Sequence, residues 1–155
     1  PTDVDRAHRE WGANCGPCAL AALLGVPVAS VRELFAGFES RHYVNPTHMG
    51  AALLQAGYTY EQTPPAKEGR QPPACGLIFL QLAGGSWDDK PIAVQYQHTH
   101  WLACKIIDGR TWLYDVNADG WLARYDWRTK IWPLFVANTK CRRCWIRTAY
   151  EVRGG

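Results

Sequence analysis

A cysteine at the start of an apolar run constrains this chain more than any other feature. The segment Asn14–Cys18 reads Asn-Cys-Gly-Pro-Cys and leads directly into Ala19–Leu24, which is followed by Gly25. Ala and Leu are strong helix formers, and proline is tolerated only in the first turn of a helix. The pattern therefore predicts a helix that begins at Cys15 to Pro17 and ends at Gly25. A thiol at that helix start lies near unpaired N–H groups and the positive end of the helix dipole, and both favour the reactive thiolate.

Two other interpretations of this cysteine pair compete with a reactive thiol. Cys-Gly-Pro-Cys is also the active-site tetrapeptide of thioredoxins, where it follows a buried strand of a βαβ unit. Here the charged segment Pro1–Asn14 precedes it and contains no apolar run of strand length, which argues against a redox role. The second alternative is a pair of inert, buried thiols, because free cysteine is among the most buried residue types.

A zinc site is a further alternative, since Cys15 and Cys18 have the same spacing as Cys141 and Cys144. Two such pairs could supply four thiolates to one Zn²⁺. The separation between the pairs is much longer than in compact zinc modules, so we expect no metal and no other cofactor. The six cysteines are also too sparse to form a disulfide framework in a chain of this size.

The composition is that of an ordinary globular protein. The 155 residues are 47% hydrophobic and 20% charged, which predicts a single domain over residues 1–155 with a substantial core. The net charge of +3 is mild, and the basic cluster Lys140–Arg147 is typical of a solvated face, so we expect no nucleic-acid partner. There is no apolar run of transmembrane length and no signal-peptide pattern. We therefore expect no membrane span, in a soluble chain that is either cytoplasmic or exported.

Two stretches are expected to lack regular structure. Pro1–Asn14 is a charged, exposed lead-in with Trp11 as its apolar anchor. Residues 63–73 contain four prolines and a glycine, which predicts a loop. Neither stretch has the character of a linker between two domains.

Two further helices are predicted after the cysteine helix. Ser30 and Glu33 have the spacing of a capping box, which indicates a short helix that ends at Gly37. A third helix is expected over Asn45–Gly57, with Thr47 as its N-cap.

Beyond residue 90 the pattern changes from helices to strands. Tyr58–Gln62 is a possible early strand, and Ala74–Ala83 is an apolar segment whose type its length leaves open. The later segments that favour strands are Pro91–Tyr96, His100–Ile107, Thr111–Val116, Trp121–Trp127 and Cys144–Val152. Asp108-Gly109 is a hairpin turn signal. The order predicts an α+β fold in which helices come first and an antiparallel meander follows.

A cysteine nucleophile needs a base, and the base needs a group that orients it. Of the five histidines, His98 and His100 lie at the start of a predicted strand and share one face, because strand side chains alternate. Either could be the base, or the two could bind a metal. Asp115 and Asn117 end the strand that follows through the hairpin turn, so ordinary hairpin register allows Asp115 to reach His100.

Taken in chain order, these pieces resemble the papain-like cysteine peptidases. The resemblance is to the bacteriocin-processing peptidases that cut after double-glycine leaders and to small phage and bacterial relatives. The matching pieces are Asn14–Leu20, Gly25–Val28 with the capped helix after it, His100–Ala103 and Asp108–Asp115. They cover most of the chain and imply a papain-like fold, with N-terminal helices packed on a C-terminal antiparallel sheet, and a peptide or protein substrate.

The resemblance also assigns roles to individual residues. It implies Cys15 as the nucleophile, His100 as the base and Asp115 as the orienting acid. Cys18 is the alternative nucleophile, because papain itself uses the second cysteine of its Cys-Gly-x-Cys. The chain departs from the family at the oxyanion donor, where Arg9 stands in place of a glutamine about six positions before the cysteine. Asn14 or Arg9 is therefore the candidate substitute donor, together with the Cys15 backbone N–H.

The predicted function is that of a cysteine hydrolase, a peptidase or isopeptidase that works through an acyl-thioester. Deamidation or transglutaminase-type acyl transfer would use the same residues with a different acceptor. A non-catalytic papain-like protein that binds or inhibits a partner is a third possibility, which the arginine at the oxyanion position favours. A zinc-binding or redox module built on the two cysteine pairs is a fourth.

Overall fold

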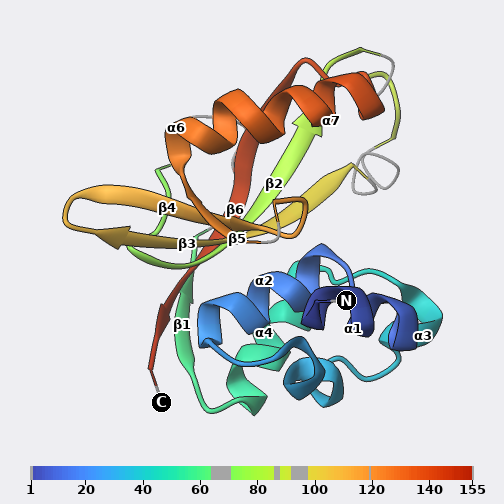
Figure 1. The fold of residues 1–155 in the computed structure, drawn as a ribbon, viewed down its shortest axis with the longest axis vertical. Helices are drawn as coiled ribbons and strands as arrows, with labels where there is room; N and C mark the ends of the chain where they lie inside the picture. Colours follow the sequence, from blue (N-terminus) through green and yellow to red (C-terminus); the bar gives the residue numbers. More distant parts are fainter. Residues whose placement is uncertain (1, 64–70, 86–87, 92–97, 119, 155) are drawn as a thin grey trace.

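The computed structural model describes residues 2–63, 71–85, 88–91, 98–118 and 120–154, and these form an α+β fold (Figure 1). The N-terminal half contains α1 (Asp3–Trp11), α2 (Cys15–Leu24), the 3₁₀ helix η1 (Val28–Leu34), α3 (Phe38–Arg41), α4 (Pro46–Gln55) and β1 (Thr59–Gln62). The C-terminal half contains β2 (Cys75–Ala83), β3 (Thr99–Ile107), β4 (Arg110–Asp115), β5 (Gly120–Ala123), α6 (Arg124–Asp126), the π-helical turn η3 (Trp127–Ile131), α7 (Trp132–Thr139) and β6 (Arg143–Arg153).

The described strands form one six-stranded antiparallel sheet in the order β1-β6-β2-β3-β4-β5. Strands β2 to β5 follow one another as a meander. The last strand, β6, lies between β1 and β2, so pairing between distant parts of the chain joins the two halves. The expected simple meander is therefore wrong at this point, because β6 returns to the middle of the sheet.

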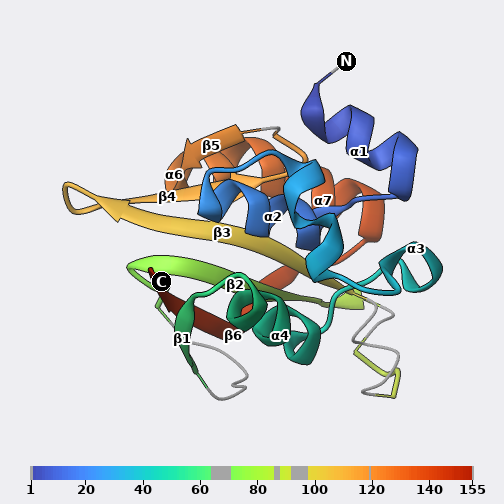
Figure 2. The same ribbon diagram turned by 90° about the horizontal axis from the view of Figure 1, so that it is seen from below.

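Helices cover both faces of the sheet (Figures 1 and 2). Alternating residues of β2 and β3 divide between two cores. Leu77, Phe79 and Trp101 belong to the larger cluster, which also contains residues of α1, α2 and α4 and is called the N-terminal core. Leu80 and Leu102 belong to a smaller cluster with residues of η3 and α7, called the C-terminal core. The period of two in each strand thus produces two separate apolar layers.

The cysteine helix and most of the strands lie where the sequence predicts them. Helix α2 begins at Cys15, and Gly25 follows it with φ of 68°, a left-handed conformation that suits glycine. Asp108 and Gly109 have φ values of 52° and 74°, as a tight hairpin turn requires, and they connect β3 to β4. The ambiguous segment Ala74–Ala83 forms strand β2, which is buried along nearly its whole length.

Three predictions for the N-terminal half are wrong. The supposed lead-in forms helix α1, whose N-cap Thr2 makes a capping box with Asp5 and which buries Trp11. The expected helix at Ser30 is a 3₁₀ helix that begins earlier, without a side-chain cap. The N-cap of α4 is Asn45 rather than Thr47, because Pro46 occupies the first helical position and Asn45 Oδ1 accepts from the His48 N–H at 2.8 Å.

The C-terminal half contains helices that the sequence patterns did not predict. The expected strand Trp121–Trp127 ends at Ala123, and α6, η3 and α7 follow it over residues 124–139. In the N-terminal half, the short helix α3 was also not predicted. The predicted strand Pro91–Tyr96 lies almost entirely outside the described residues, as does most of the proline-rich loop 63–73.

Within the described part of the chain, no single helix has both the length and the apolar composition to cross a membrane. One pair, α2 with η1, meets these criteria jointly but is bent by 112° between its members.

Candidate active site

The local structure around Cys15 fixes the start of α2. Asn14 caps the helix, because its Oδ1 accepts from the Gly16 N–H at 3.4 Å while its Nδ2 donates to the His42 carbonyl at 2.8 Å. Gly16 allows a close approach, since a Cβ there would lie 2.7 Å from Val44 Cγ2. The helix start is therefore tied to the chain between α3 and α4, and Cys15 is left partly exposed.

Strand β3 carries His100 into the same region. Its neighbour Trp101 points into the N-terminal core and donates from Nε1 to the Val44 carbonyl at 2.8 Å. His100, on the opposite face, is 6% exposed, and its ring lies 4.9 Å from that of Phe135 in an edge-on contact. Because side chains alternate along the strand, Trp101 anchors β3 on one face while His100 places its imidazole on the other.

Asp115 reaches His100 through the register of the β3–β4 hairpin. Tyr114 pairs with Ala103, so the next residue, Asp115, falls opposite Leu102 and on the same face as His100. His100 Nε2 lies 3.0 Å from Asp115 Oδ1, an ion-pair contact in which the ring N–H is not well aligned with the oxygen. Because Nε2 faces the carboxylate, the other ring nitrogen, Nδ1, is the one left for Cys15.

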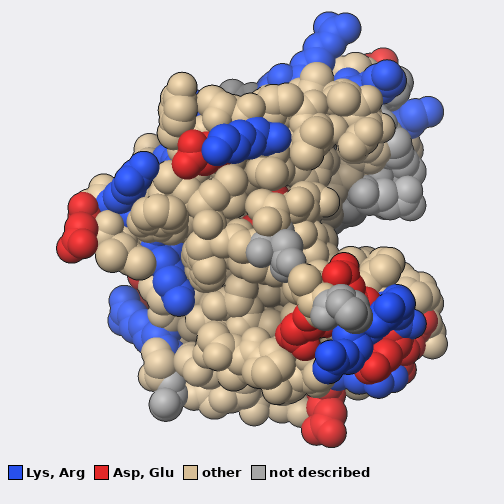
Figure 3. All heavy atoms as spheres, in the orientation of Figure 1, with Lys and Arg blue, Asp and Glu red and all other residues tan. Residues whose placement is uncertain are grey.

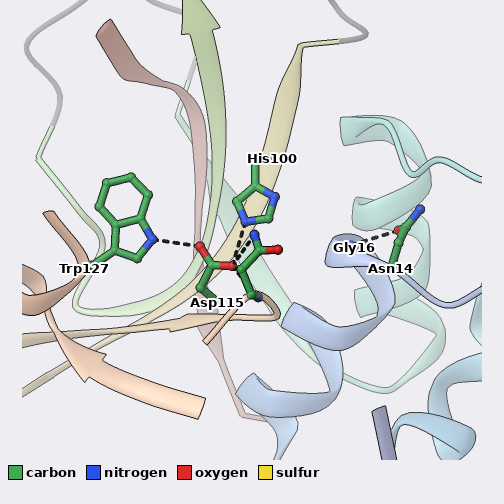
Figure 4. A network of polar contacts seen from close by, with 6 residues as sticks. Asn14, Gly16, His100, Asp115 and Trp127 are labelled. Atoms are coloured by element: carbon green, nitrogen blue, oxygen red, sulfur yellow. Dashed lines mark hydrogen bonds and ion pairs between the residues drawn. The ribbon is translucent and has the colours of Figure 1, made fainter. Parts of the chain in front are cut away.

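The Asp115 carboxylate is fully buried and is held on all sides (Figure 4). Oδ1 accepts from the Asn117 backbone N–H at 2.8 Å and from Asn117 Nδ2 at 3.0 Å. Oδ2 accepts from the indole Nε1 of Trp127 at 2.7 Å. Trp127 and His100 thus approach different oxygens, so the carboxylate has little freedom to turn away from the imidazole.

The charges of Cys15, His100 and Asp115 depend on one another and on burial. Burial raises the pKa of the Cys15 thiol, but the charge of His100, its hydrogen bond and the Trp101 backbone N–H outweigh burial, so the pKa is lowered overall. Burial lowers the pKa of His100, and the Cys15 thiolate and the Asp115 carboxylate outweigh it, so that pKa is raised. Burial also raises the pKa of Asp115, yet His100, Trp127 and Asn117 together hold it below its ordinary value. All three shifts favour the charged forms, in which Cys15 is a thiolate, His100 an imidazolium and Asp115 a carboxylate.

Cys15 opens onto a cleft of about 840 Å³. The cleft is lined by α2, the segment before and within α4, and the strands β1, β2, β3 and β6, and its apolar lining includes Tyr43, Phe79 and Trp101. Arg147 is the one Lys or Arg among its described lining residues, which include no Asp or Glu. Figure 3 shows one face of the molecule, on which charged side chains gather around α1 while the surface between the helical layers is mostly neutral.

The proposed oxyanion donors lie differently from the expectation. Arg9 lines a separate depression between α1 and Val116, not the cleft at Cys15, so the structure gives no support to Arg9 as a donor there. Asn14 lines the cleft, but its oxygen caps α2 and its amide nitrogen donates to His42. The remaining candidate is the backbone N–H of Cys15, which lies in the first turn of α2, where N–H groups have no acceptor within the helix.

The alternative site residues also have clear positions. Cys18 is completely buried in the N-terminal core, unlike Cys15. His98 lies just before β3, where its carbonyl accepts from the Leu82 N–H at 2.9 Å, and burial lowers the pKa of its ring. Asn117 contacts Asp115 and supports it. The role of Trp127 was not foreseen, because a tryptophan at the end of a strand-like segment carries no local signal for a carboxylate partner.

The cysteine pairs do not form a metal centre in the described part of the chain. All six cysteines are free thiols, and no group of three or more His, Cys, Asp or Glu side chains among the described residues is placed to hold a metal ion.

In comparisons with known proteins, the chain matches no protein-family model and no curated protein sequence.

Proposed function

We propose that this chain is a cysteine hydrolase with a papain-like fold, in which Cys15 is the nucleophile, His100 the general base and acid, and Asp115 the orienting group. The observation that carries the proposal is the buried imidazole of His100, which lies between a partly exposed thiol and a fully buried carboxylate. Surface histidines and structural cysteines seldom combine a lowered thiol pKa with a raised imidazole pKa at a cleft.

The acylation step uses the charges already present in the site. The Cys15 thiolate attacks the carbonyl carbon of a peptide or isopeptide bond, and the backbone N–H of Cys15 donates to the developing oxyanion. The C–N bond breaks as the His100 imidazolium gives its proton to the leaving amine. The products of this step are a free amine, an acyl-thioester on Cys15 and a neutral His100.

Water completes the cycle. Neutral His100 takes a proton from a water molecule, whose oxygen attacks the thioester carbonyl. The C–S bond breaks, the acid product leaves, and the thiolate–imidazolium pair is restored. Asp115 keeps its charge throughout and holds the ring orientation, as the carboxylate does in other triads.

The cleft supports a peptide as substrate. Its volume of about 840 Å³ falls within the range of roughly 300–1,000 Å³ typical of ligand sites. The exposed ring of Tyr43 and polar side chains such as Gln62 and Thr99 offer both kinds of contact that a peptide chain requires.

The test is digestion of a defined peptide mixture, a tryptic digest of casein, followed by mass spectrometry. We expect the unaltered chain to produce shorter peptides whose summed mass exceeds the parent mass by one water. The variant Cys15→Ala should produce none, whereas the matched variant Cys18→Ala should retain activity, because Cys18 lies in the core away from the cleft. Loss of ammonia or cross-linking to an added amine in place of cleavage would identify deamidation or acyl transfer instead.

A second measurement does not depend on finding a substrate. Cys15 and Cys144 are both partly exposed, but burial raises the pKa of Cys144 to about 11 whereas that of Cys15 is lowered. Iodoacetamide at neutral pH should therefore label Cys15 much faster than Cys144. Equal labelling of the two thiols, together with no cleavage of the casein peptides, would contradict the proposal.

A further inference from the structure

A second pocket, separate from the cleft at Cys15, lies on the other face of the sheet. It has a volume of about 500 Å³ and opens between the sheet and the segment that contains α6 and η3. Leu80, Leu102 and Ile146 line its apolar floor, and Trp127 lines its side. A site of this size, with an apolar lining, fits a small molecule with an extended apolar part.

Three arginines line this pocket: Arg143 lies on β6 and pairs with Asp88 at 3.9 Å, whereas Arg124 and Arg128 lie four residues apart on the segment that contains α6 and η3. Arg124 and Arg128 both line it, and both are exposed. The Arg124 charge opposes the rise that burial causes in the pKa of Cys104, and Arg128 does the same for Cys144. Both arginines therefore place positive charge at the mouth of the pocket, where each also remains open to solvent.

The charges of Arg124 and Arg128 are not balanced within the described part of the chain. Neither Arg124 nor Arg128 makes an ion pair there, and the described lining residues of the pocket include no Asp or Glu. Two like charges this close in sequence on a helical segment repel each other. An anion placed between them would remove this repulsion and form charge-assisted hydrogen bonds with both groups.

The backbone at this point is also unusual. Residues Trp127–Ile131 form a π-helical turn, which is rare and often occurs at functional sites. Trp127 is the first residue of this turn; it lines the pocket, and its Nε1 donates to Asp115 at the end of β4.

We propose that this pocket binds a small amphiphilic carboxylate, with its apolar chain over Leu80, Leu102 and Ile146 and its carboxylate between Arg124 and Arg128. The proposal is independent of the catalytic function at Cys15. It does predict contact between the ligand and Trp127, the residue that also holds Asp115.

The test is calorimetric titration of the full chain with decanoate, kept below its micelle concentration. We expect saturable binding, at least tenfold weaker for the neutral matched compound decan-1-ol. The double variant Arg124→Gln with Arg128→Gln should bind decanoate at least tenfold more weakly. The matched control, Arg6→Gln with Arg110→Gln, removes two exposed charges outside the pocket and should bind decanoate as the unaltered chain does.

A second readout locates the ligand and remains valid if the double variant fails to fold. Addition of decanoate to the unaltered chain should shift the indole N–H signal of Trp127 in nitrogen–proton correlation spectra. The indole signal of Trp11, buried in the N-terminal core, should not move. Absence of saturable binding, equal affinity for decan-1-ol, or shifts that spare Trp127 would each overturn the proposal.

Discussion

The two faces of the sheet contribute different parts of the candidate site. The N-terminal face supplies Cys15 through a capped helix that packs on a large core, and it holds β3 through the Trp101 contact with Val44. The C-terminal face carries His100 and Asp115, and its smaller core also borders the pocket beneath Arg124 and Arg128. The difference shows that the position of the sulfur and the orientation of the imidazole depend on separate layers. Variants on each side should therefore have separable effects.

The largest expected effect comes from His100, which lies on the C-terminal face and contacts Cys15 of the N-terminal layer. Replacement His100→Ala removes the proposed base, and general acid–base catalysis contributes roughly 10²–10⁴-fold to a rate. We expect casein-peptide cleavage to fall by that amount and iodoacetamide labelling of Cys15 to slow at neutral pH, because the thiolate loses its counter-ion. The matched variant His98→Ala should leave both rates close to normal. A similar loss in both variants would contradict the assignment of His100.

The pH dependence of the cleavage rate reports on Cys15 at one end and on His100 at the other. Burial raises the pKa of Cys15, but the His100 charge more than reverses this, so the thiolate persists to lower pH than in an ordinary cysteine. Burial lowers the pKa of His100, yet the Cys15 thiolate and Asp115 raise it to about 10. Cleavage needs both the thiolate and the protonated ring, so its rate should be bell-shaped and fall about tenfold per pH unit beyond each limb.

Labelling by iodoacetamide gives a different curve from cleavage. It needs only the thiolate, so the labelling rate should fall on the acid side and remain high on the alkaline side, where His100 loses its proton. Parallel alkaline limbs for labelling and cleavage would show that the proton of His100 is not required for departure of the amine.

An intermediate effect is expected from the C-terminal layer alone. Trp127→Phe removes the donor at 2.7 Å from Asp115 Oδ2, and a hydrogen bond to a charged group contributes about 1.5–3 kcal/mol. The free energy of unfolding should fall by about that amount, because the buried oxygen loses its partner. The control is Trp132→Phe, which changes a ring whose centroid lies 6.2 Å from that of Trp127. This variant should lower the free energy of unfolding by an amount that does not depend on pH.

The sign of that pH dependence follows from Asp115. Burial alone would raise the pKa of Asp115, but His100, Trp127 and Asn117 lower it by more than burial raises it. The folded-state pKa therefore lies below the unfolded value. The stabilisation is present above the unfolded pKa and is lost as pH falls through the folded pKa. The cost of Trp127→Phe, measured by denaturant unfolding, should therefore be full at neutral pH and shrink in acid. A cost that is constant with pH would mean that the indole stabilises packing only.

The sequence predicted the parts of the candidate site that have local signals. Cys15 follows from the Gly-Pro step before an Ala-Leu run, and Asp115 from hairpin register across Asp108-Gly109. The contact of Trp127 with Asp115 depends on a helical segment that the alternating aromatic residues after Gly120 do not reveal. The placement of β6 beside β1 and β2 likewise depends on pairing across most of the chain, which no local pattern encodes.

The smallest expected effect tests the N-terminal layer, at Asn14. As an N-cap and a partner of the His42 carbonyl, Asn14 should contribute about 0.5–2 kcal/mol to the free energy of unfolding, so Asn14→Ala should lower it by that amount. Asn14→Ser retains a hydroxyl oxygen that can cap the helix and should lose less.

The same two variants decide whether Asn14 is an oxyanion donor. Loss of such a donor costs roughly 10²–10³-fold in rate. Because the amide nitrogen of Asn14 already donates to His42, the rate of casein-peptide cleavage by Asn14→Ala should fall far less than this. Asn14→Ser keeps a cap oxygen, removes the amide donor and adds no charge beside the Cys15 thiolate, so it separates the two roles more sharply. A hundredfold loss of cleavage in Asn14→Ser, with little change in unfolding, would assign the amide to the reaction and would place the second oxyanion donor on the N-terminal layer beside the sulfur.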